Sequence, residues 1–259
     1  MKNFLISFLK FICMRMKIFG FDAKAIIYLK HYPKFKKQKQ EWLNKGGVIN
    51  KNFMILSDYS ANAGVTKGHY FHQDLLVASF IFENKPKRHI DVGSRIDGFV
   101  SSVASFREIE IIDIRSIPKS EHKNIKFIQA DLMNPITIGQ ADSLSCLHAI
   151  EHFGLGRYND PIDIEGHKKG IDNLVELTKP DGTLYISFPI GIKDEVSFNA
   201  HRVFHPESIL KFKCIYEKMK LTRFDYVDDQ GNLHLNTSVD SAVGKNKYGC
   251  GIYTFKKNN

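Results

Sequence analysis

Carboxylates follow two apolar runs of this 259-residue chain at a spacing that suits the sugar of a nucleoside. Asp91 lies in the segment HIDVG, and Asp113 ends the run EIID 22 residues further on. A carboxylate at that distance commonly accepts hydrogen bonds from both hydroxyls of a ribose. Gly93 permits the tight turn that a Cβ atom would obstruct. These residues predict a crevice for a nucleoside-type cofactor.

Four apolar runs, each ending in polar residues, must position these groups. Asp131 follows the third run, and Glu151 with His152 follows the fourth. Because the ligands of parallel α/β sheets lie beyond the carboxyl ends of the strands, we expect the polar residues at one edge of a sheet. The sequence therefore predicts an α/β fold with a mostly parallel sheet flanked by helices. The four runs are residues 89–92, 109–113, 125–130 and 143–150.

The glycine pattern after the first run argues against a phosphate-binding loop. A dinucleotide site has the pattern G-x-G-x-x-G, whereas Arg95 occupies the middle glycine position here and Gly98 closes a G-x4-G. A nicotinamide-dependent dehydrogenase is therefore disfavoured. A cofactor without phosphates fits this loop better.

Five segments along these strands resemble the class I S-adenosylmethionine-dependent methyltransferases. They are DVGSRIDG, EIIDIR, FIQADLMN, DSLSCLHAIEHF and LTKPDGTLYISFPI, and they cover roughly residues 89–190. In that superfamily a Pro-x-Gly turn precedes the fifth strand, as Pro180 and Gly182 precede a predicted strand over 183–188. LTRFDYVDD and YGCGIYTFKK resemble the reversed final strand pair. The resemblance implies a Rossmann-like, mostly parallel seven-stranded sheet.

The resemblance also implies S-adenosylmethionine as the cofactor. Asp113 would bind the ribose diol, Asp131 would accept from the adenine amino group, and His148 would line the methionine and sulfonium side. The alternative from the residues alone is that Asp91 and Asp113 cap helices or turns. The residues expected to contact the cofactor are Asp91, Gly93, Ser94, Asp113, Asp131 and His148.

Methyl transfer is a direct displacement, so the enzyme mainly orients its reactants and accepts a proton. The expected catalytic residues are His152, Glu151 and His201. We prefer His152 as the base, because an imidazole titrates near neutral pH. A loop-positioning role for His152 is an equal alternative, and Glu151 could serve only to orient a neighbour.

Two later segments carry donors for an anionic, sugar-bearing substrate. Arg157 and Tyr158 follow a glycine-rich loop and offer a fork of donors and a stacking ring. Arg202 lies before Pro206 and Glu207, which predict the first turn of a helix running to about Lys220. Ordinary surface placement is the alternative for these side chains.

No metal ion is expected from the sequence. His69, His72 and Asp74 lie close together, but no further ligands accompany them at a recognised spacing. The four cysteines form no C-x-x-C pair, so free thiols and a cytoplasmic location are expected.

A narrower resemblance concerns the segments HYFHQDL, GLGRYNDPID and FNAHRVFHP. They resemble a bacterial methyltransferase-like family of unknown function linked to surface-polysaccharide genes. This resemblance implies O-methylation of a sugar hydroxyl, with a sugar, nucleotide-sugar or lipid-linked saccharide as the acceptor. The alternative is a non-catalytic protein of the same fold that binds or scaffolds polysaccharide assembly.

Basic charge is confined to one end of the chain. Residues 1–51 carry net charge +10, whereas residues 52–259 total −1. We therefore expect a basic appendage over 1–51 and a methyltransferase-like domain over 52–259. Because the basic charge is confined to this segment, we do not expect nucleic acid as a partner. We expect an anionic membrane surface instead.

The beginning of the chain has the pattern of an interfacial helix. Its apolar residues, among them Phe4, Phe8 and Phe19, fall on one half of a helical projection. No uncharged run approaches the roughly 20 residues of a membrane span, so peripheral binding at the inner face of the cell membrane is expected. The alternative is that this helix docks on the protein's own core or on a second copy of the chain. In the second case the protein would be a homo-oligomer.

Overall fold

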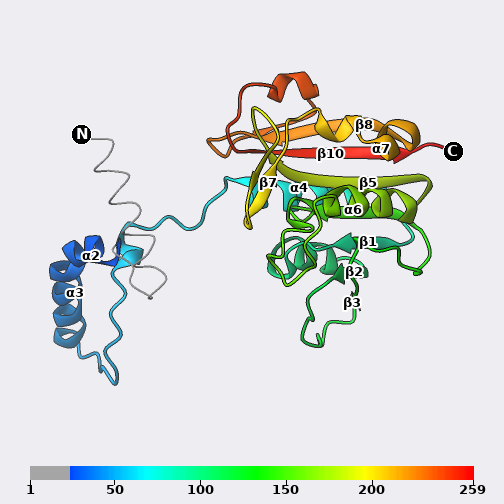
Figure 1. Ribbon diagram of the computed structural model, residues 1–259. Coiled ribbons are helices and arrows are strands. Elements are labelled where there is room, and N and C mark those ends of the chain that lie inside the picture. Colours follow the sequence, from blue (N-terminus) through cyan, green and yellow to red (C-terminus); the bar gives the residue numbers. More distant parts are fainter. Residues whose placement is uncertain (1–23) are drawn as a thin grey trace. The chain divides into compact units, whose positions relative to one another are not determined.

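The computed structural model describes residues 24–259 (Figure 1). The amphipathic helix expected over the first 19 residues lies outside the described residues. The chain divides into two compact units, with the division between Val65 and Thr66. Each unit is described by itself. The boundary expected at residue 51 rests on charge alone and stays a prediction.

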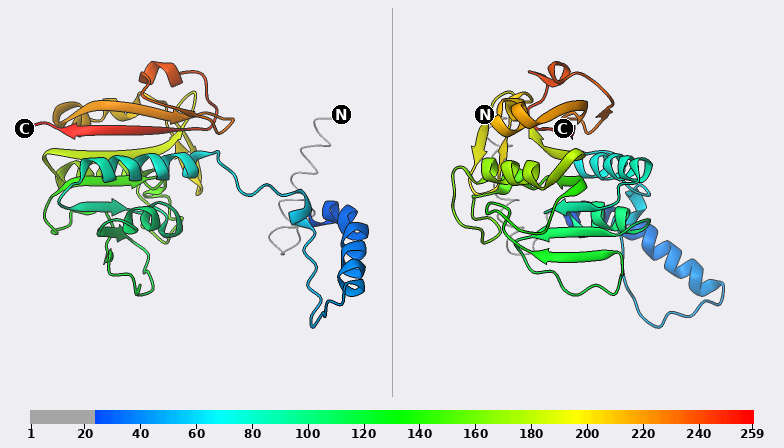
Figure 2. Two further views of the ribbon diagram at one scale, coloured as in Figure 1. Left: turned by 180° about the vertical axis from the view of Figure 1, so that it is seen from behind. Right: turned by 90° about the vertical axis from the view of Figure 1, so that its right-hand side faces the viewer.

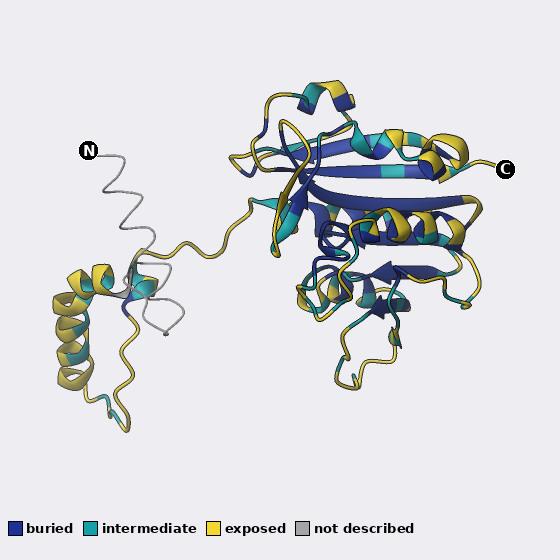
Figure 3. Ribbon diagram, viewed as in Figure 1, coloured by how far each residue is buried: buried dark blue, intermediate teal, exposed yellow. Residues whose placement is uncertain are grey.

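The described part of the first unit consists of two helices and an extended segment. The helices are α2 (Lys24–Tyr28) and α3 (Tyr32–Asn44). The indole of Trp42 donates to the carbonyl of Val48, which folds the extended segment back towards α3. Leu56 is buried, whereas most other apolar side chains of this unit are exposed (Figure 3).

The second unit is built on an eight-stranded sheet. The strand order is β3-β2-β1-β4-β5-β10-β8-β9, in which β9 has only two residues. The first five strands of this order pair in parallel, and β10 pairs antiparallel with both β5 and β8. The Rossmann-like sheet with a reversed final strand pair is thereby confirmed. The strands are β1 (His89–Val92), β2 (Ile109–Asp113), β3 (Ile125–Gln129), β4 (Ala141–Leu147), β5 (Thr178–Ile190), β8 (Met219–Val227), β9 (Leu233–His234) and β10 (Gly249–Lys257).

Helices cover both faces of the sheet (Figure 2). The helices α4 (His69–Asn84) and α5 (Ser101–Ala104) pack on one face, where Val77 and Val103 join one apolar cluster. The helices α6 (Gly166–Leu177) and α7 (Lys213–Lys218) pack on the other, where Leu174 and Ile215 join a second cluster. The central strands β1 and β4 are buried on both sides, and polar side chains within them bond to one another, as His89 does to Ser143 and Ser145 does to Asp91.

A short hairpin lies beyond the carboxyl end of β5. It consists of β6 (Glu195–Ser197) and β7 (His201–Val203), which pair antiparallel. An isolated parallel bridge between Ile190 and Phe204 joins the hairpin to β5. The hairpin therefore brings the segment around His201 to the edge where the polar residues of the sheet gather.

The structure corrects three element boundaries. The fourth strand ends at Leu147, because His148 has a left-handed backbone with φ 50° and a 3₁₀ turn follows it. The fifth strand begins at Thr178 and includes the Pro-Asp-Gly turn as an irregularity, with Asp181 at φ 57°. The helix expected from Pro206 to about Lys220 is wrong. It is replaced by a 3₁₀ turn, the six-residue α7 and the start of β8.

Within residues 24–259, no helix combines the length and the apolar character needed to cross a membrane.

Candidate cofactor and acceptor site

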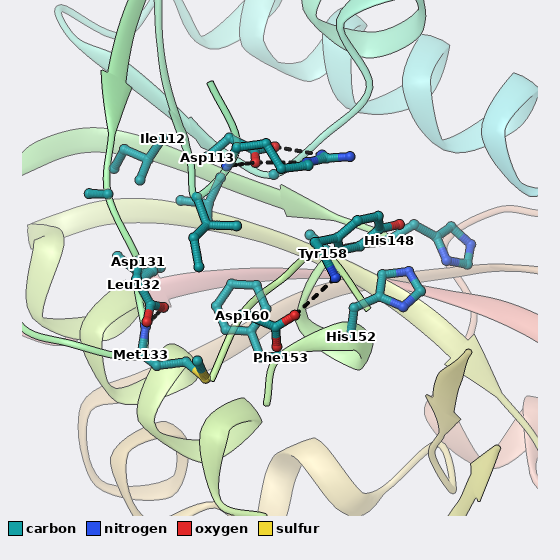
Figure 4. A pocket seen from close by; sticks show the side chains of 16 residues that line it. Ile112, Asp113, Asp131, Leu132, Met133, His148, His152, Phe153, Tyr158 and Asp160 are labelled. Carbon is teal, nitrogen blue, oxygen red and sulfur yellow. Dashed lines mark hydrogen bonds and ion pairs between the residues drawn. The ribbon is translucent and has the colours of Figure 1, made fainter. Parts of the chain in front are cut away.

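A pocket opens at the carboxyl ends of β1, β2 and β4 (Figure 4). It encloses about 530 Å³, including space open to solvent, and its lining is mostly apolar. Asp113 and Asp131 lie towards one end, and His148 and His152 lie towards the other. We call these the carboxylate end and the histidine end.

The turn after β1 is held by a buried carboxylate beneath the pocket. Asp91 is fully buried and accepts from the Ser94 hydroxyl at 2.7 Å, the Ser94 amide at 3.1 Å and the Ser145 hydroxyl at 2.5 Å. Burial raises the pKa of Asp91 to about 7, while these hydrogen bonds act in the opposite direction. Asp91 and Ser94 therefore shape the loop from below, and neither lines the pocket.

Gly93 is the residue of this turn that faces the pocket. Its φ is 69°, and a Cβ atom on it would lie 2.8 Å from the Cβ of Ala149. Its amide donates to the carbonyl of Ile112 at 2.9 Å, which ties the end of β1 to β2. Glycine is required here both by the backbone conformation and by the close approach of the neighbouring loop.

Asp113 ends β2 and lies in the wall of the pocket. Its carboxylate binds the Arg115 guanidinium in a bidentate pair, with nitrogen–oxygen distances of 2.9 and 2.6 Å. The Arg115 amide donates to the same carboxylate at 2.8 Å. The Arg115 guanidinium also lies 4.3 Å from the centre of the Tyr158 ring. A ribose at Asp113 would therefore have to share this carboxylate with Arg115 or displace it.

Asp131 follows β3 and starts a tight turn at the carboxylate end. Its two oxygens accept from the Met133 amide at 2.9 Å and from the Asn134 side chain at 3.1 Å. Leu132 and Met133 extend from this turn into the pocket wall. An apolar slot beside a carboxylate acceptor has the chemistry that an adenine ring with its amino group requires.

The histidine end contains a buried acid between two imidazoles. Nδ1 of His148 lies 2.7 Å from Oε1 of Glu151, and Nε2 of His152 lies 3.7 Å from the same oxygen. Nδ1 of His152 donates to the carbonyl of Ala200 at 2.7 Å, so its Nε2 carries the lone pair. Burial lowers the pKa of His152, which keeps this imidazole neutral near pH 7. His152 therefore has the tautomer that a general base needs.

The loop after His152 is fastened by Asp160. The Asp160 carboxylate accepts from the amides of Gly154, Gly156 and Tyr158 at 2.9 to 3.1 Å. The two glycines have positive φ values, and a Cβ atom on Gly154 would lie 2.0 Å from a carbonyl oxygen. The loop is therefore bent and pinned. It places the Tyr158 ring edge-on against His152, with centroids 5.4 Å apart.

The expected substrate-binding residues have different surroundings. Arg157 is exposed and donates to the carbonyl of Ala200 at 2.7 Å, beside His152. Arg202 is buried, and its Nη1 donates to the carbonyls of Glu151 at 3.3 Å and Phe153 at 2.6 Å. These bonds hold the turn that contains Glu151 and His152 in place. They leave the substrate contact expected for Arg202 without support.

His201 is half-buried on β7, and its ring lies 5.2 Å from the Tyr248 ring. Burial lowers the pKa of His201. The Tyr248 ring also lies 5.5 Å from the His69 ring, so His201 lies near the histidine end, and its catalytic role stays a prediction. Two residues with prominent places were missed, namely Arg115 and Cys250. Arg115 could have been noticed because it stands two residues after Asp113. Cys250 and His69, which the sequence grouped only with His72 and Asp74, meet His148 through the tertiary fold, so no local signal marks this cluster.

The strand order, the reversed β10 and the pocket beyond β1, β2 and β4 define the fold class of this unit. It is the Rossmann-like fold of the class I S-adenosylmethionine-dependent methyltransferases.

Solved structures of that class superimpose on the chain at low sequence identity. The 1,6-didemethyltoxoflavin-N1-methyltransferase of Burkholderia thailandensis, with bound 1,6-didemethyltoxoflavin and S-adenosylhomocysteine, has a TM-score of 0.55 and 10% identity, covering 82% of this chain and 95% of its own. The N-methyltransferase NodS of Bradyrhizobium japonicum, in complex with S-adenosylhomocysteine, has a TM-score of 0.50 and 13% identity, covering 79% and 92%. The [4+2]-cyclase SpnF has a TM-score of 0.51 and 13% identity, covering 76% and 86%. These likenesses show the fold.

A family model described as "Caenorhabditis protein of unknown function, DUF268" matches residues 124–235. The matched segment includes His148, Glu151, His152 and the loop pinned by Asp160. A comparison with curated proteins gave no match.

Proposed function

We propose that the protein is an S-adenosylmethionine-dependent O-methyltransferase. The observation that carries this proposal is the pocket with a carboxylate end and a histidine end on a methyltransferase fold. In this proposal Asp113 accepts from a ribose diol, Asp131 accepts from an adenine amino group, and the turn at Gly93 faces the methionine portion. His152 stands at the opposite end with its lone pair free.

The S-adenosylhomocysteine in the complexes of two similar structures supports the cofactor. When bound, S-adenosylmethionine would supply an electrophilic methyl group. The chain's own residues orient an acceptor hydroxyl and receive its proton. The Ala200 carbonyl holds His152 in the required tautomer, and Nε2 of His152 takes the proton as the oxygen–methyl bond forms and the sulfur–methyl bond breaks.

For the acceptor we propose an anionic sugar, free or linked to a nucleotide or lipid. Arg157, Tyr158, His201 and Tyr248 surround the histidine end with cationic, aromatic and hydrogen-bonding groups. Such a mixture is suited to a saccharide ring that carries negative charge. The resemblance of three segments to a family linked to surface polysaccharides supports the same acceptor.

A non-catalytic protein of the same fold is the second candidate. One observation favours it, since Arg115 occupies both oxygens of Asp113 and would compete with a ribose. The cyclase SpnF among the similar structures also indicates that the fold is not confined to methyl transfer.

Calorimetric titration of the full chain separates these two candidates. We expect S-adenosylmethionine and S-adenosylhomocysteine to bind with micromolar dissociation constants, about −8 kcal/mol, while NAD gives no heat. If neither sulfur compound binds to the folded protein, the non-catalytic candidate replaces the enzyme.

We further propose that the basic first unit binds the inner face of the cell membrane. Residues 24–65 contain eight lysines and only two acids. They also expose large apolar side chains, including Ile26, Leu29, Trp42 and Phe53. Exposed apolar groups beside lysines are suited to an anionic lipid surface.

Replacing the four lysines of residues 34–39 by glutamine should weaken binding to vesicles that contain anionic phosphatidylglycerol by at least about 100-fold. The estimate follows from about 1 kcal/mol for each lysine near such a surface. Co-sedimentation with the vesicles measures the change. Glutamine at the four lysines of residues 211–220 removes the same charge from the second unit and serves as the control. Equal losses in both variants would contradict a membrane role for the first unit.

A further inference from the structure

Three potential metal ligands meet beside the histidine end of the pocket. They are Nδ1 of His69, Nε2 of His148 and Sγ of Cys250, and they all lie within 4.8 Å of one another. His69 begins α4, His148 follows β4, and Cys250 lies near the start of β10. Imidazole nitrogen and thiolate sulfur are the ligands that zinc prefers.

The two imidazoles have the separation of metal ligands. Their facing nitrogens are 3.2 Å apart. Two nitrogens bound at roughly 2.0–2.1 Å to a tetrahedral ion would lie about 3.3 Å apart. A sulfur bound at about 2.3 Å would lie about 3.6 Å from each nitrogen. Because no separation in the cluster exceeds 4.8 Å, metal binding would require the distances from the Cys250 sulfur to shorten by no more than about 1.2 Å.

A second observation concerns the charge behind the cluster. Glu151 is buried, and its Oε1 holds Nδ1 of His148 at 2.7 Å. A carboxylate in this position fixes the ring so that Nε2 faces the cluster, as carboxylates behind metal-binding histidines do. The other oxygen, Oε2 of Glu151, is buried and has no hydrogen-bond partner within the described residues 24–259. A buried carboxylate with an unpaired oxygen needs positive charge nearby.

We propose that His69, His148 and Cys250 bind a divalent transition-metal ion of the zinc type, with Glu151 as the group that orients His148. This departs from the absence of a metal expected from sequence. Three protein ligands leave one coordination position, which is typical of catalytic zinc sites. If the proposed methyl transfer holds, that position receives the acceptor oxygen. The metal then eases release of the hydroxyl proton to His152, while the oxygen–methyl bond forms and the sulfur–methyl bond breaks.

The alternative is a cluster held by hydrogen bonds alone. In that case His69 and His148 share one N–H···N bond, and the Cys250 thiol donates to the Gln73 side chain at 3.7 Å. Both descriptions keep the cluster intact, so a direct measurement with a metal ion decides between them.

The test is a spectroscopic titration of the chelator-treated full chain with Co²⁺. We expect one equivalent to bind with a thiolate-to-cobalt charge-transfer band and the strong visible bands of four-coordinate cobalt, and Zn²⁺ to displace it. Cys250→Ser should remove the charge-transfer band, and Cys214→Ser, which alters another buried cysteine, should retain it. His69→Gln should weaken binding at least about tenfold, and His72→Gln should not.

Glu151→Gln tests whether Glu151 orients His148. We expect this variant to bind the metal about 10- to 100-fold more weakly, which is the usual effect of losing such a group. Circular dichroism establishes that each variant is folded. Absence of cobalt binding by the wild-type chain, or an unchanged spectrum in folded Cys250→Ser, would overturn the metal site. Neither result bears on the titration with S-adenosylmethionine, so failure of the metal proposal and failure of the proposed function remain distinguishable.

Discussion

Asp113→Ala is expected to weaken the binding of S-adenosylmethionine and S-adenosylhomocysteine by at least about 100-fold. In the proposed function, the Asp113 carboxylate at the end of β2 accepts from both ribose hydroxyls. A hydrogen bond to a charged group contributes about 1.5–3 kcal/mol, so loss of two corresponds to at least about 3 kcal/mol. At 1.4 kcal/mol for each tenfold change, the expected effect is about 100-fold. Calorimetric titration of both compounds measures it.

Asp97→Ala is the matched control for this variant. Asp97 is exposed and paired with Arg95, and it does not line the pocket. We expect its dissociation constants to stay within about twofold of the wild type. If folded Asp113→Ala binds both compounds as tightly as the wild type, Asp113 only pairs with Arg115 and the ribose site lies elsewhere.

His152→Asn is expected to lower the turnover of methyl transfer by about 10²- to 10⁴-fold, the usual contribution of a general base. Asparagine can still donate to the Ala200 carbonyl from the position of Nδ1, but it lacks Nε2. The affinity for S-adenosylmethionine should therefore change little. Release of S-adenosylhomocysteine, measured with nucleotide-sugar and lipid-linked acceptors, gives the rate.

The pH profile of the wild type tests the same assignment. Burial lowers the pKa of His152 below its ordinary value of 6.5. The base acts in its neutral form, so activity should be level around neutral pH and fall only as the pH drops below about 6.5. His122→Asn, in an exposed loop, should retain both rate and profile. If His152→Asn keeps the wild-type rate, His152 only positions its loop.

Local patterns were sufficient to predict the strands that carry the cofactor end of the site. Asp91, Asp113 and Asp131 each stand at or near the end of a short apolar run, and a parallel sheet aligns such ends at one edge. The predicted strands therefore indicated the edge of the sheet where Asp113 and Asp131 line the pocket, whereas Asp91 lies beneath it, and the cofactor contacts of all three stay predictions. Which donors these carboxylates accept from could not be predicted, since the Asp113–Arg115 pair depends on side-chain rotamers and not on spacing.

One other prediction failed and a second is without support. The helix expected after Pro206 did not form as one piece, because Phe212 adopts an extended conformation and the chain joins the sheet again at Met219. The substrate contact expected for Arg202 stays a prediction, and Nη1 of Arg202 donates instead to the carbonyls of Glu151 and Phe153. Both outcomes depend on partners distant in sequence, which no local pattern encodes.

The position of β10 determines when the sheet of the second unit can be completed during synthesis. β10 lies between β5 and β8, although it is the last strand in the chain (Figure 1). During synthesis, β8 has no place in the sheet until residues 249–257 have left the ribosome. Cys250 belongs to this strand, so the cluster beside His148 is also assembled last. The half of the sheet with Asp91, Asp113 and Asp131 precedes β10 on the chain, so the cluster of His69, His148 and Cys250 can form only after the strands of the carboxylate end have been synthesised.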